Sequence, residues 1–361
     1  MASFEPSSPP SVWVLTDDRP GNRTQALGVA RALGWPFVEK KLAFNALQHG
    51  SPAALGATLD TLDGDSRAEI APPWPDLVLA AGRRAVPVAR YVRRATSGTT
   101  RIVLIGRRTP AEEADLVIRC AYFRQAATPN LVEVTLPPTQ VDGPTLARVR
   151  AEEQNPFATL PKPVCVMLVG GETGRHRFRP DFAERMAAEV THAAADAGAS
   201  LAIVTSRRTG AEGVTALKRG APGALLFEWR PNAPGGAYLS YIANADFLVV
   251  TGESESMLAE AAASGRPLTI YPLVARPLSP MLRIRSAIAA MATSRMLSPL
   301  LGWIMVGGWV APRRDLANLH RMIEGRRWGR IFDGSLNTEP PQPFDGDEVV
   351  ATRVKSLFAA G

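Results

Sequence analysis

The chain has 361 residues, enough for two ordinary domains that each bury a core. Hydrophobic residues make up 46% of it and charged residues 21%, which is typical of a folded globular protein and excludes a disordered one. The formal net charge is +7, from 41 Lys and Arg against 34 Asp and Glu, and this excess favours anionic partners.

Disulfide, metal and nucleic-acid chemistry are all disfavoured by the sequence. Cys120 and Cys165 lie in separate apolar runs, so we expect two reduced cysteines in the core. The four histidines are scattered singly, and no His, Cys and Asp residues have the spacing of a metal site. The arginines form no basic stripe with interleaved aromatic residues, so nucleic acid is not an expected partner.

Neither a targeting signal nor a membrane span is expected. Residues 1–10 lack the features of a secretory signal and are interpreted as a short disordered lead. No apolar run reaches the length of a membrane span, although residues 296–311 come nearest. We therefore expect a cytoplasmic protein. The run at 296–311 is either a patch that contacts an anionic membrane from its inner face or an ordinary insertion packed against its domain.

The first predicted elements are a strand over 12–15 and a helix that ends at Leu33, with Asn22 suited to cap that helix. A strand, a Gly-containing loop and a helix are how a Rossmann-like domain begins, although the GxGxxG fingerprint is absent. Asp17 and Asp18 lie in the loop. A carboxylate there is either a general base for an acceptor hydroxyl or an ordinary turn residue.

More short β-rich runs alternate with helical stretches through the first half of the chain. Strands are predicted near 37–42, 76–81, 102–105, 116–118 and 131–134. This alternation predicts a parallel sheet that is covered by helices on both faces.

Three predicted strands end in a small residue followed by two arginines. The triplets are Gly82-Arg83-Arg84, Gly106-Arg107-Arg108 and, in the second half, Ser206-Arg207-Arg208. The carboxyl ends of parallel strands share one edge of a sheet, and guanidinium groups bind phosphate or carboxylate oxygens two at a time. The triplets predict an anion-binding cleft lined from both domains. The alternative for each pair is one solvated arginine and one that caps a helix or bridges to an acid.

A Pro-rich boundary separates the two halves, with Pro137-Pro138 at its start and a further break over 155–163. Beyond it, residues 164–169 form an almost wholly apolar run, as expected for the central strand of a parallel sheet. This strand ends in Gly170-Gly171, and Arg175 follows as a candidate cation for a diphosphate. Further helices are predicted over 181–197, 212–219 and 238–243, and further strands over 201–205 and 224–228.

The next crossover unit is a strand over 247–250 followed by a helix over 257–263 and another strand. Ser254 and Ser256 lie at the start of the helix, where hydroxyls and backbone N–H groups bind anions. Glu260 lies further into the helix, and a carboxylate there suits a pair of ribose hydroxyls. The alternative is that the serines only cap the helix and that Glu260 is solvated.

Glu260 stands five residues before the glycine of Gly265-Arg266-Pro267, and in this the segment resembles the nucleotide-sugar half-site of two-domain (GT-B) glycosyltransferases. In those enzymes a Glu in this position contacts the donor ribose. A Gly-Gly turn after the first strand of their donor domain approaches the donor phosphates. The paired Gly170-Gly171 matches that turn.

The chain as a whole resembles the bacterial relatives of the plant "elongated mitochondria" fission protein. The similar segments are TDDRPGNRTQALGVARAL, DLVLAAGRR, VGGETGRHRF, TSRRT, the segment around Glu260 and LHRMIEGRRWGRIFDG. The GT-B resemblance implies an α/β fold with two Rossmann-like domains that face each other across a cleft, over 11–154 and 162–335. A helix over 345–359 would pack back on the first domain.

These resemblances also imply metal-independent glycosyl transfer from a nucleotide-diphosphate sugar to a lipid-linked or envelope acceptor. The sugar nucleotide is then a substrate, and no cofactor is expected. Glu260 would hold the ribose, and Asp17 or Asp18 would deprotonate the acceptor. The remaining donor site would consist of Gly170, Gly171, Arg175, Ser206, Arg207, Arg208, Ser254 and Ser256, with Arg83, Arg84 and Arg107 lining the cleft.

Two other functions fit the same features. One is a GT-B-like protein that has lost its chemistry and acts as a scaffold at membranes, as the relationship to a fission protein allows. The other is a nucleotide-sugar epimerase, which needs a carboxylate pair or a histidine in the cleft to remove a proton.

Overall fold

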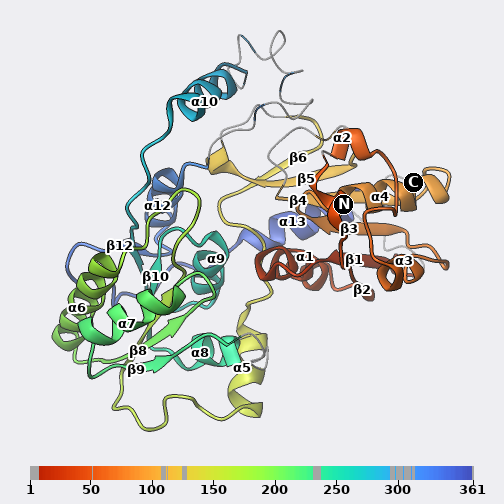
Figure 1. Ribbon diagram of the computed structural model, residues 1–361. Coiled ribbons are helices and arrows are strands. Elements are labelled where there is room, and N and C mark those ends of the chain that lie inside the picture. The colour runs from red at the N-terminus through yellow and green to blue at the C-terminus, as the bar shows by residue number, and fades with distance from the viewer. Residues whose placement is uncertain are drawn as a thin grey trace. The chain divides into compact units, whose positions relative to one another are not determined.

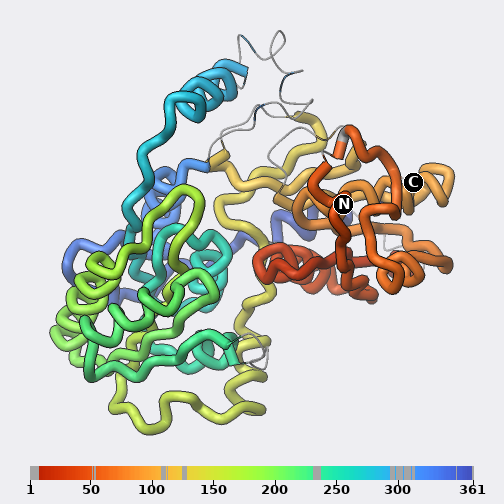
Figure 2. Tube along the Cα trace, in the orientation of Figure 1, coloured from red at the N-terminus to blue at the C-terminus, as the bar shows by residue number. Residues whose placement is uncertain are grey.

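The described residues of the computed structural model are 8–359 apart from 51, 107–110, 112, 124–127, 231–236, 293–296, 298–303, 305–309 and 311–313. The chain forms two compact units, each around its own six-stranded sheet (Figure 1, Figure 2). The first unit consists of Met1–Gln140, Leu278–Asp315 and Asp345–Gly361, and the second of Val141–Pro277 and Leu316–Phe344. The predicted α/β class with two Rossmann-like units is confirmed.

The first unit begins with β1 (Val12–Thr16), α1 (Pro20–Leu33), β2 (Phe37–Lys41), η1 (Ala46–His49), α2 (Pro52–Leu55), α3 (Gly64–Ala68) and β3 (Leu77–Ala81). It continues with α4 (Val86–Ala95), β4 (Arg101–Ile105), β5 (Leu116–Cys120), η2 (Ala121–Phe123), β6 (Leu131–Val134), α10 (Pro280–Ala292) and α13 (Gly346–Lys355). The predicted alternation of strands and helices is therefore present.

The first sheet has the strand order β2-β1-β3-β4-β5-β6, and its strands are parallel. The chain leaves β1 for β2 on one side and returns to β3 on the other, so the loops after β1 and β3 flank the switch point of the sheet. Leu15, Val78 and Leu104 share a core with Val88 and Val92 of α4. Helix α1 also contacts β1 and β3.

Helix α1 begins at Pro20, before the predicted cap Asn22. A proline at the first helical position has its φ fixed in the helical range and needs no N–H partner. Asn22 therefore lies within the first turn, and its side-chain amide donates to the two carboxylate oxygens of Asp17 at 3.2 and 3.1 Å. The predicted cap is wrong, and Asn22 instead holds the loop after β1.

The last helix, α13, returns to the first unit as predicted and packs against α1 and β6 (Figure 1). Val350 and Val354 on its inner face are fully buried. Just beyond the helix, Phe358 meets Trp35 edge-on with 5.3 Å between the ring centroids. The end of the chain is thus part of the first core.

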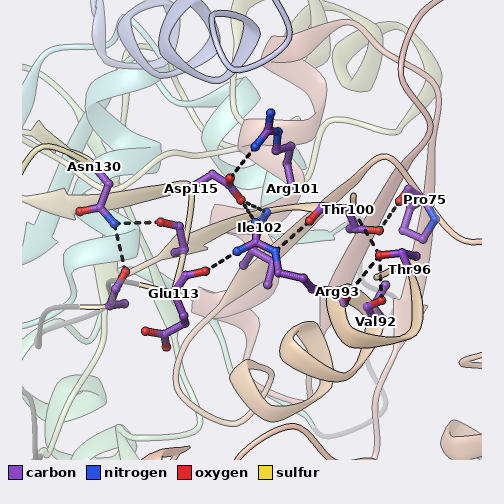
Figure 3. Close-up of polar contacts among 12 residues, drawn as sticks. Pro75, Val92, Arg93, Thr96, Thr100, Arg101, Ile102, Glu113, Asp115 and Asn130 are labelled. Carbon is purple, nitrogen blue, oxygen red and sulfur yellow. Dashed lines mark hydrogen bonds and ion pairs between the residues drawn. The ribbon is translucent and has the colours of Figure 1, made fainter. Parts of the chain in front are cut away.

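Asp115 ties the amino ends of β4 and β5 to helix α4 (Figure 3). Its Oδ2 accepts the Ile102 N–H at 2.7 Å and the Arg93 guanidinium, and its Oδ1 pairs with Arg101 at 3.1 Å. Burial and the nearby Arg101 charge lower the pKa of Arg93. Because open α/β sheets bind ligands at the carboxyl ends of their strands, we interpret this network at the amino ends as structural.

The second unit begins with α5 (Gly143–Glu152), β7 (Val164–Val169), α6 (Pro180–Asp196), β8 (Ser200–Thr205), α7 (Gly210–Gly220) and β9 (Leu225–Phe227). It continues with α8 (Ala237–Asn244), β10 (Phe247–Thr251), α9 (Glu255–Ala263), β11 (Leu268–Tyr271), α12 (Leu316–Gly325) and β12 (Arg330–Ile331).

The second sheet has the order β12-β11-β10-β7-β8-β9 and is again parallel. The chain runs outward from β7 to β9 on one side and from β10 to β12 on the other, so β7 and β10 flank the switch point. Cys165, Met167 and Val169 alternate toward the core formed with α6 and α7. Cys120 and Cys165 are both buried in the cores, as predicted.

The division into units differs from the predicted domain boundaries at two places. The sequence placed helix α5 in the first domain, but it packs on α8, and Arg150 Nε donates to the Ala243 carbonyl at 2.7 Å. Helix α10, which was not predicted, is grouped with the first unit although the sequence placed it in the second. Proline-rich breaks locate the ends of elements, whereas the packing surface decides which unit an element joins.

Candidate functional site

The candidate site lies at the carboxyl edge of the second sheet. Its switch point is formed by the Gly170-Gly171 turn after β7 and by the loop over 252–254 after β10. The loop after β8, with Ser206 and Arg208, lies directly beside that turn because β8 pairs with β7. The fold therefore brings together residues from three of the predicted donor-binding segments.

The Gly-Gly turn has no space for side chains. A Cβ on Gly170 would lie 1.8 Å from Glu253 Oε1, and one on Gly171 would lie 2.3 Å from the Arg208 carbonyl oxygen. Gly171 also has a φ of +126°, which side-chain-bearing residues rarely adopt. The Gly170 N–H donates to Thr251 Oγ1 at 2.8 Å, and its carbonyl accepts the Ser206 hydroxyl. The turn thus needs glycine at both positions.

Glu253 is the central side chain of the turn. Its Oε1 accepts the Gly171 N–H at 2.8 Å and lies 3.3 Å from Arg208 Nη2. The Glu253 side chain is wholly buried, whereas a third of the Arg208 side chain is exposed. Burial raises the pKa of the Glu253 carboxyl, although the Arg208 charge and hydrogen bonds act in the opposite direction.

Glu253 was not among the residues predicted from the sequence. The available signal was an acidic residue two positions after the end of a buried strand at a switch point. Its presence changes the interpretation of Gly170 and Gly171, which were predicted to offer their N–H groups to phosphates. Both N–H groups already have acceptors within the protein.

Ser254 and Ser256 lie where they were predicted, at the start of α9. Ser254 is buried at the N-cap position, and it makes no side-chain capping hydrogen bond to the described residues. Ser256 is half-buried in the first turn. Their binding of a phosphate stays a prediction.

Glu260 is buried in α9, and 7% of its surface is exposed. Its Oε2 accepts the hydroxyl of Tyr238 in α8 at 2.9 Å. Burial first, and then the Glu260 charge and hydrogen bond, raise the pKa of Tyr238 well above its ordinary value. The alternative in which Glu260 is solvated is therefore wrong, and the carboxylate is held in one orientation.

His320 supports the loop after β10 from helix α12. Its Nε2 lies 2.8 Å from the Gly252 carbonyl oxygen, to which it donates in the Nε2–H tautomer. A Cβ on Gly252 would lie 2.6 Å from the same nitrogen. His320 is buried and positions the loop, a role that the sequence alone did not indicate.

The predicted cations of the second unit divide into exposed and engaged groups. Arg207 is exposed, whereas Arg208 pairs with Glu253, so this pair matches the alternative of one solvated arginine and one bridge to an acid. Arg175 is half-buried, and its carbonyl accepts the Arg276 N–H at 2.6 Å. Within the described ranges, no three His, Cys, Asp or Glu residues are grouped so that they could hold a metal ion.

In the first unit, Arg84 lies between Asp17 and Asp18 at the switch point. It pairs with Asp17 Oδ2 at 2.6 Å and with the Asp18 carboxylate, and it lies over the Phe44 ring. Arg84 and Asp17 are buried, but 75% of the Asp18 side chain is exposed. The hydrogen bond from Arg84 lowers the pKa of Asp18. Of the two predicted bases, Asp18 is therefore the accessible one.

Of the predicted cleft arginines of the first unit, the two that the structure describes, Arg83 and Arg84, are also engaged. The two carboxylates neutralise Arg84, which favours the bridging alternative over an open anion site. Arg83 is exposed, and its Nη1 donates to the Gly50 carbonyl at 3.0 Å. Arg107 lies outside the described residues.

The chain is thus a two-unit Rossmann-like protein with two parallel sheets. Its second unit carries the candidate site, which consists of a glycine turn, an arginine and two buried glutamates. The family model "Mitochondrial fission ELM1" matches residues 20–358. The chain therefore belongs to the mitochondrial fission ELM1 family, as the resemblance indicated.

The chain is also similar to two curated proteins. The "Mitochondrial fission protein ELM1" of Arabidopsis thaliana is 26% identical over 220 residues, which are 54% of this chain and 51% of that protein. The "Uncharacterized protein RP120" of Rickettsia prowazekii (strain Madrid E) is 22% identical over 307 residues, which are 72% of this chain and 83% of that protein. The match to the Arabidopsis protein thus spans about half of its length.

A solved structure with a similar fold is the UDP-GlcNAc 2-epimerase from Methanocaldococcus jannaschii. It aligns over 97% of this chain and 100% of that chain, with 11% sequence identity and a TM-score of 0.49. At this level of similarity, no activity is transferred to this chain.

Proposed function

We propose that this protein binds a nucleotide-diphosphate sugar on its second unit and transfers the sugar without a metal ion. The observation that carries the proposal is the buried Glu260 of α9, the helix that follows the switch-point strand β10. Its carboxylate accepts the hydroxyl of Tyr238 from α8. Ligands of open α/β sheets bind at this edge. A carboxylate fixed there is suited to accept hydrogen bonds from the two hydroxyls of a ribose.

The leaving diphosphate needs positive charge, which the same edge supplies. Arg207 is exposed beside the Gly-Gly turn, and Arg208 is partly exposed. The N-terminus of α9 adds its backbone N–H groups and its dipole. Fixed donors of this kind stabilise charge that develops on a leaving group, so the proposed transfer does not require a metal ion.

Deprotonation of the acceptor is assigned to the first unit. Asp18 has the exposed carboxylate, whereas Asp17 is buried in its ion pair with Arg84. We propose Asp18 as the base, with Arg84 and Asp17 holding the loop in place. The acceptor is proposed to be a lipid-linked or envelope molecule.

Calorimetry with UDP, GDP, ADP, CMP and their sugars, without added metal, tests the binding step. We expect saturable binding of one nucleotide sugar, weakened about 10- to 100-fold in Glu260→Gln, because the ribose loses a charged acceptor. Tyr238→Phe keeps the charge and should weaken binding less. Glu212→Gln, which changes an exposed glutamate of α7, is the matched control and should bind like the wild type.

The outcome separates the proposed function from its alternatives. A folded protein that binds none of these ligands contradicts the proposal and favours a non-catalytic scaffold. If a sugar nucleotide binds, release of the free nucleoside diphosphate together with attachment of the sugar to an added acceptor indicates transfer, whereas release with free sugar indicates hydrolysis. Conversion of the bound sugar without that release indicates an epimerase, and phosphorus and proton NMR of the products distinguish the two.

A second candidate function, contact with an anionic membrane surface, is favoured by helix α10. Met281, Leu282 and Ile284 are 65%, 50% and 58% exposed, and Arg283 and Arg285 lie between and after them. Exposed apolar residues beside cations are typical of helices that lie on anionic lipid. The predicted patch at 296–311 lies outside the described residues except for 297, 304 and 310, and no helix among those described is long and apolar enough to cross a membrane.

Sedimentation with lipid vesicles tests this second function. We expect binding to vesicles that contain phosphatidylserine, but not to vesicles of phosphatidylcholine alone, and we expect salt to weaken it. Ile284→Asp should reduce the bound fraction several-fold. Leu47→Asp, which places the same charge at a similarly exposed aliphatic residue elsewhere in the first unit, is the control. Equal binding of both variants would contradict a role for α10.

A further inference from the structure

Glu253 binds the groups at the switch point of the second sheet that an anionic ligand would use. Its Oε1 accepts the Gly171 N–H at 2.8 Å and lies 3.3 Å from Arg208 Nη2. A backbone N–H at a glycine turn and a guanidinium are common donors to phosphate oxygens. Here both are bound by a carboxylate of the chain itself.

The carboxylate is incompletely satisfied for a buried charge. Its side chain is wholly buried, and Oε2 has no hydrogen-bond partner in the part of the chain that the structure describes. Burying a carboxylate oxygen that accepts no hydrogen bond destabilises the folded state, and the penalty is large because the group is charged. Protonation removes that charge and so reduces the penalty. Burial accordingly raises the pKa of Glu253.

Among the described residues, Arg208 is the charged side chain that forms an ion pair with Glu253, at 3.3 Å. Arg208 faces it from the loop after β8, and the turn after β7 contributes only the backbone of Gly170 and Gly171. From α12, His320 contacts the neighbouring Gly252 carbonyl. On α9, Glu260 is bonded to Tyr238. Arg208 is therefore the cation for which Glu253 and an incoming anion compete.

We propose that Glu253 is an internal anion of the ligand site: a phosphate group of the ligand takes over the Gly171 N–H and Arg208, and Glu253 takes up a proton as it yields them. Two anions on the same two donors would repel each other strongly in a buried site. Ligand affinity should therefore fall as the pH rises and Glu253 ionises. The inference rests on the proposed function for the identity of the ligand, but a simple anion tests it.

Inorganic pyrophosphate is the probe, titrated calorimetrically into the full-length protein. Glu253→Gln keeps an acceptor for the Gly171 N–H and removes the charge, so we expect pyrophosphate to bind at least about tenfold more tightly than to the wild type. Glu172→Gln removes the same charge from an exposed side chain beside Gly171 and should change the affinity less than about twofold. Arg208→Gln should cancel the gain in the Glu253→Gln background.

Titrations in buffers of different ionisation enthalpy count the protons that are taken up. We expect the wild type to take up more protons per bound pyrophosphate than Glu253→Gln. Pyrophosphate itself also binds protons, but this contribution is the same in both proteins, so subtracting one proton count from the other leaves the uptake by Glu253. If Glu253→Gln shows neither tighter binding nor a lower proton uptake, the proposal is wrong and Glu253 is only a structural anchor. If Glu253→Gln gains pyrophosphate affinity but no nucleotide sugar binds, this inference stands and the proposed function falls.

Discussion

Burial of Glu253 links the stability of the second unit to pH. Its pKa is raised from the ordinary value of 4.5, so the folded state favours the protonated carboxyl. The resulting stabilisation is fully present below pH 4.5 and is lost as the pH rises through the folded-state pKa, because the unfolded state releases the proton first. Glu253→Gln lacks this dependence. Urea unfolding at a series of pH values should show the variant becoming more stable relative to the wild type as the pH rises. A difference in the free energy of unfolding between the two proteins that does not change with pH would contradict a raised pKa of Glu253.

Gly171 is the residue whose substitution should cost the most at the site. Gly171→Ala places a Cβ 2.3 Å from the Arg208 carbonyl oxygen at a φ of +126°, so we expect a loss of at least about 3 kcal/mol in the free energy of unfolding. Gly198→Ala is the control, since its φ is +65° but the new Cβ meets no described atom within 4 Å. It should cost only about 1–2 kcal/mol. Equal losses in urea unfolding would show that backbone strain, and not the clash, governs Gly171.

At the scale of elements, helix α13 offers a test of how the end of the chain supports the first unit. Val354 is fully buried against α1 and β6, whereas Val349 on the same helix is 53% exposed. Val354→Ala should lower the free energy of unfolding by about 2 kcal/mol, because methyl groups are lost from a packed core. Val349→Ala should change it by less than about 0.5 kcal/mol. Similar losses in the two variants would show that α13 does not pack as described.

The crossover elements of the second unit have separate tasks. The strands β7 and β10 supply the Gly-Gly turn and the loop of Glu253, and helix α9 carries Glu260. Helices α8 and α12 do not line the turn, but their Tyr238 and His320 hold Glu260 and Gly252 in place. A site built on rigid elements with such support keeps its geometry before a ligand arrives.

At the scale of the whole molecule, each unit has its own core. Leu104 belongs to the core of the first sheet and Met167 to that of the second. We expect residue-resolved hydrogen exchange to show that Leu104→Ala lowers protection mainly in the first unit and Met167→Ala mainly in the second. The residues that lose protection in Leu104→Ala should include those of α13, although this helix is distant from Leu104 in the sequence. Uniform loss of protection in both units would indicate a single cooperative structure.

Much of the fold could be predicted because the signal for an element is local. Residues 164–169 are apolar without a break since β7 is buried on both faces, and the predicted helix over 181–197 matches α6 at Pro180–Asp196. The positions of Gly170, Gly171 and Glu260 at the sheet edge follow from the same patterns. The start of α1 at Pro20 and the presence of helix α10 were not predicted. A proline can either begin or interrupt a helix, and α10 exposes apolar residues instead of burying them on one face.

By itself, the sequence determined the α/β class, the main strands and helices and the edge at which the candidate residues gather. Only the tertiary structure decided which polar groups are already engaged. Gly171 and Glu253 are 82 positions apart, and Asp17 and Arg84 are 67 apart, yet each pair shares a hydrogen bond. A buried N–H, carboxylate or guanidinium must find a partner, and strand order decides which distant residue provides it. Local pattern therefore indicated where the candidate residues lie along the chain, whereas topology decided which distant groups they bond to.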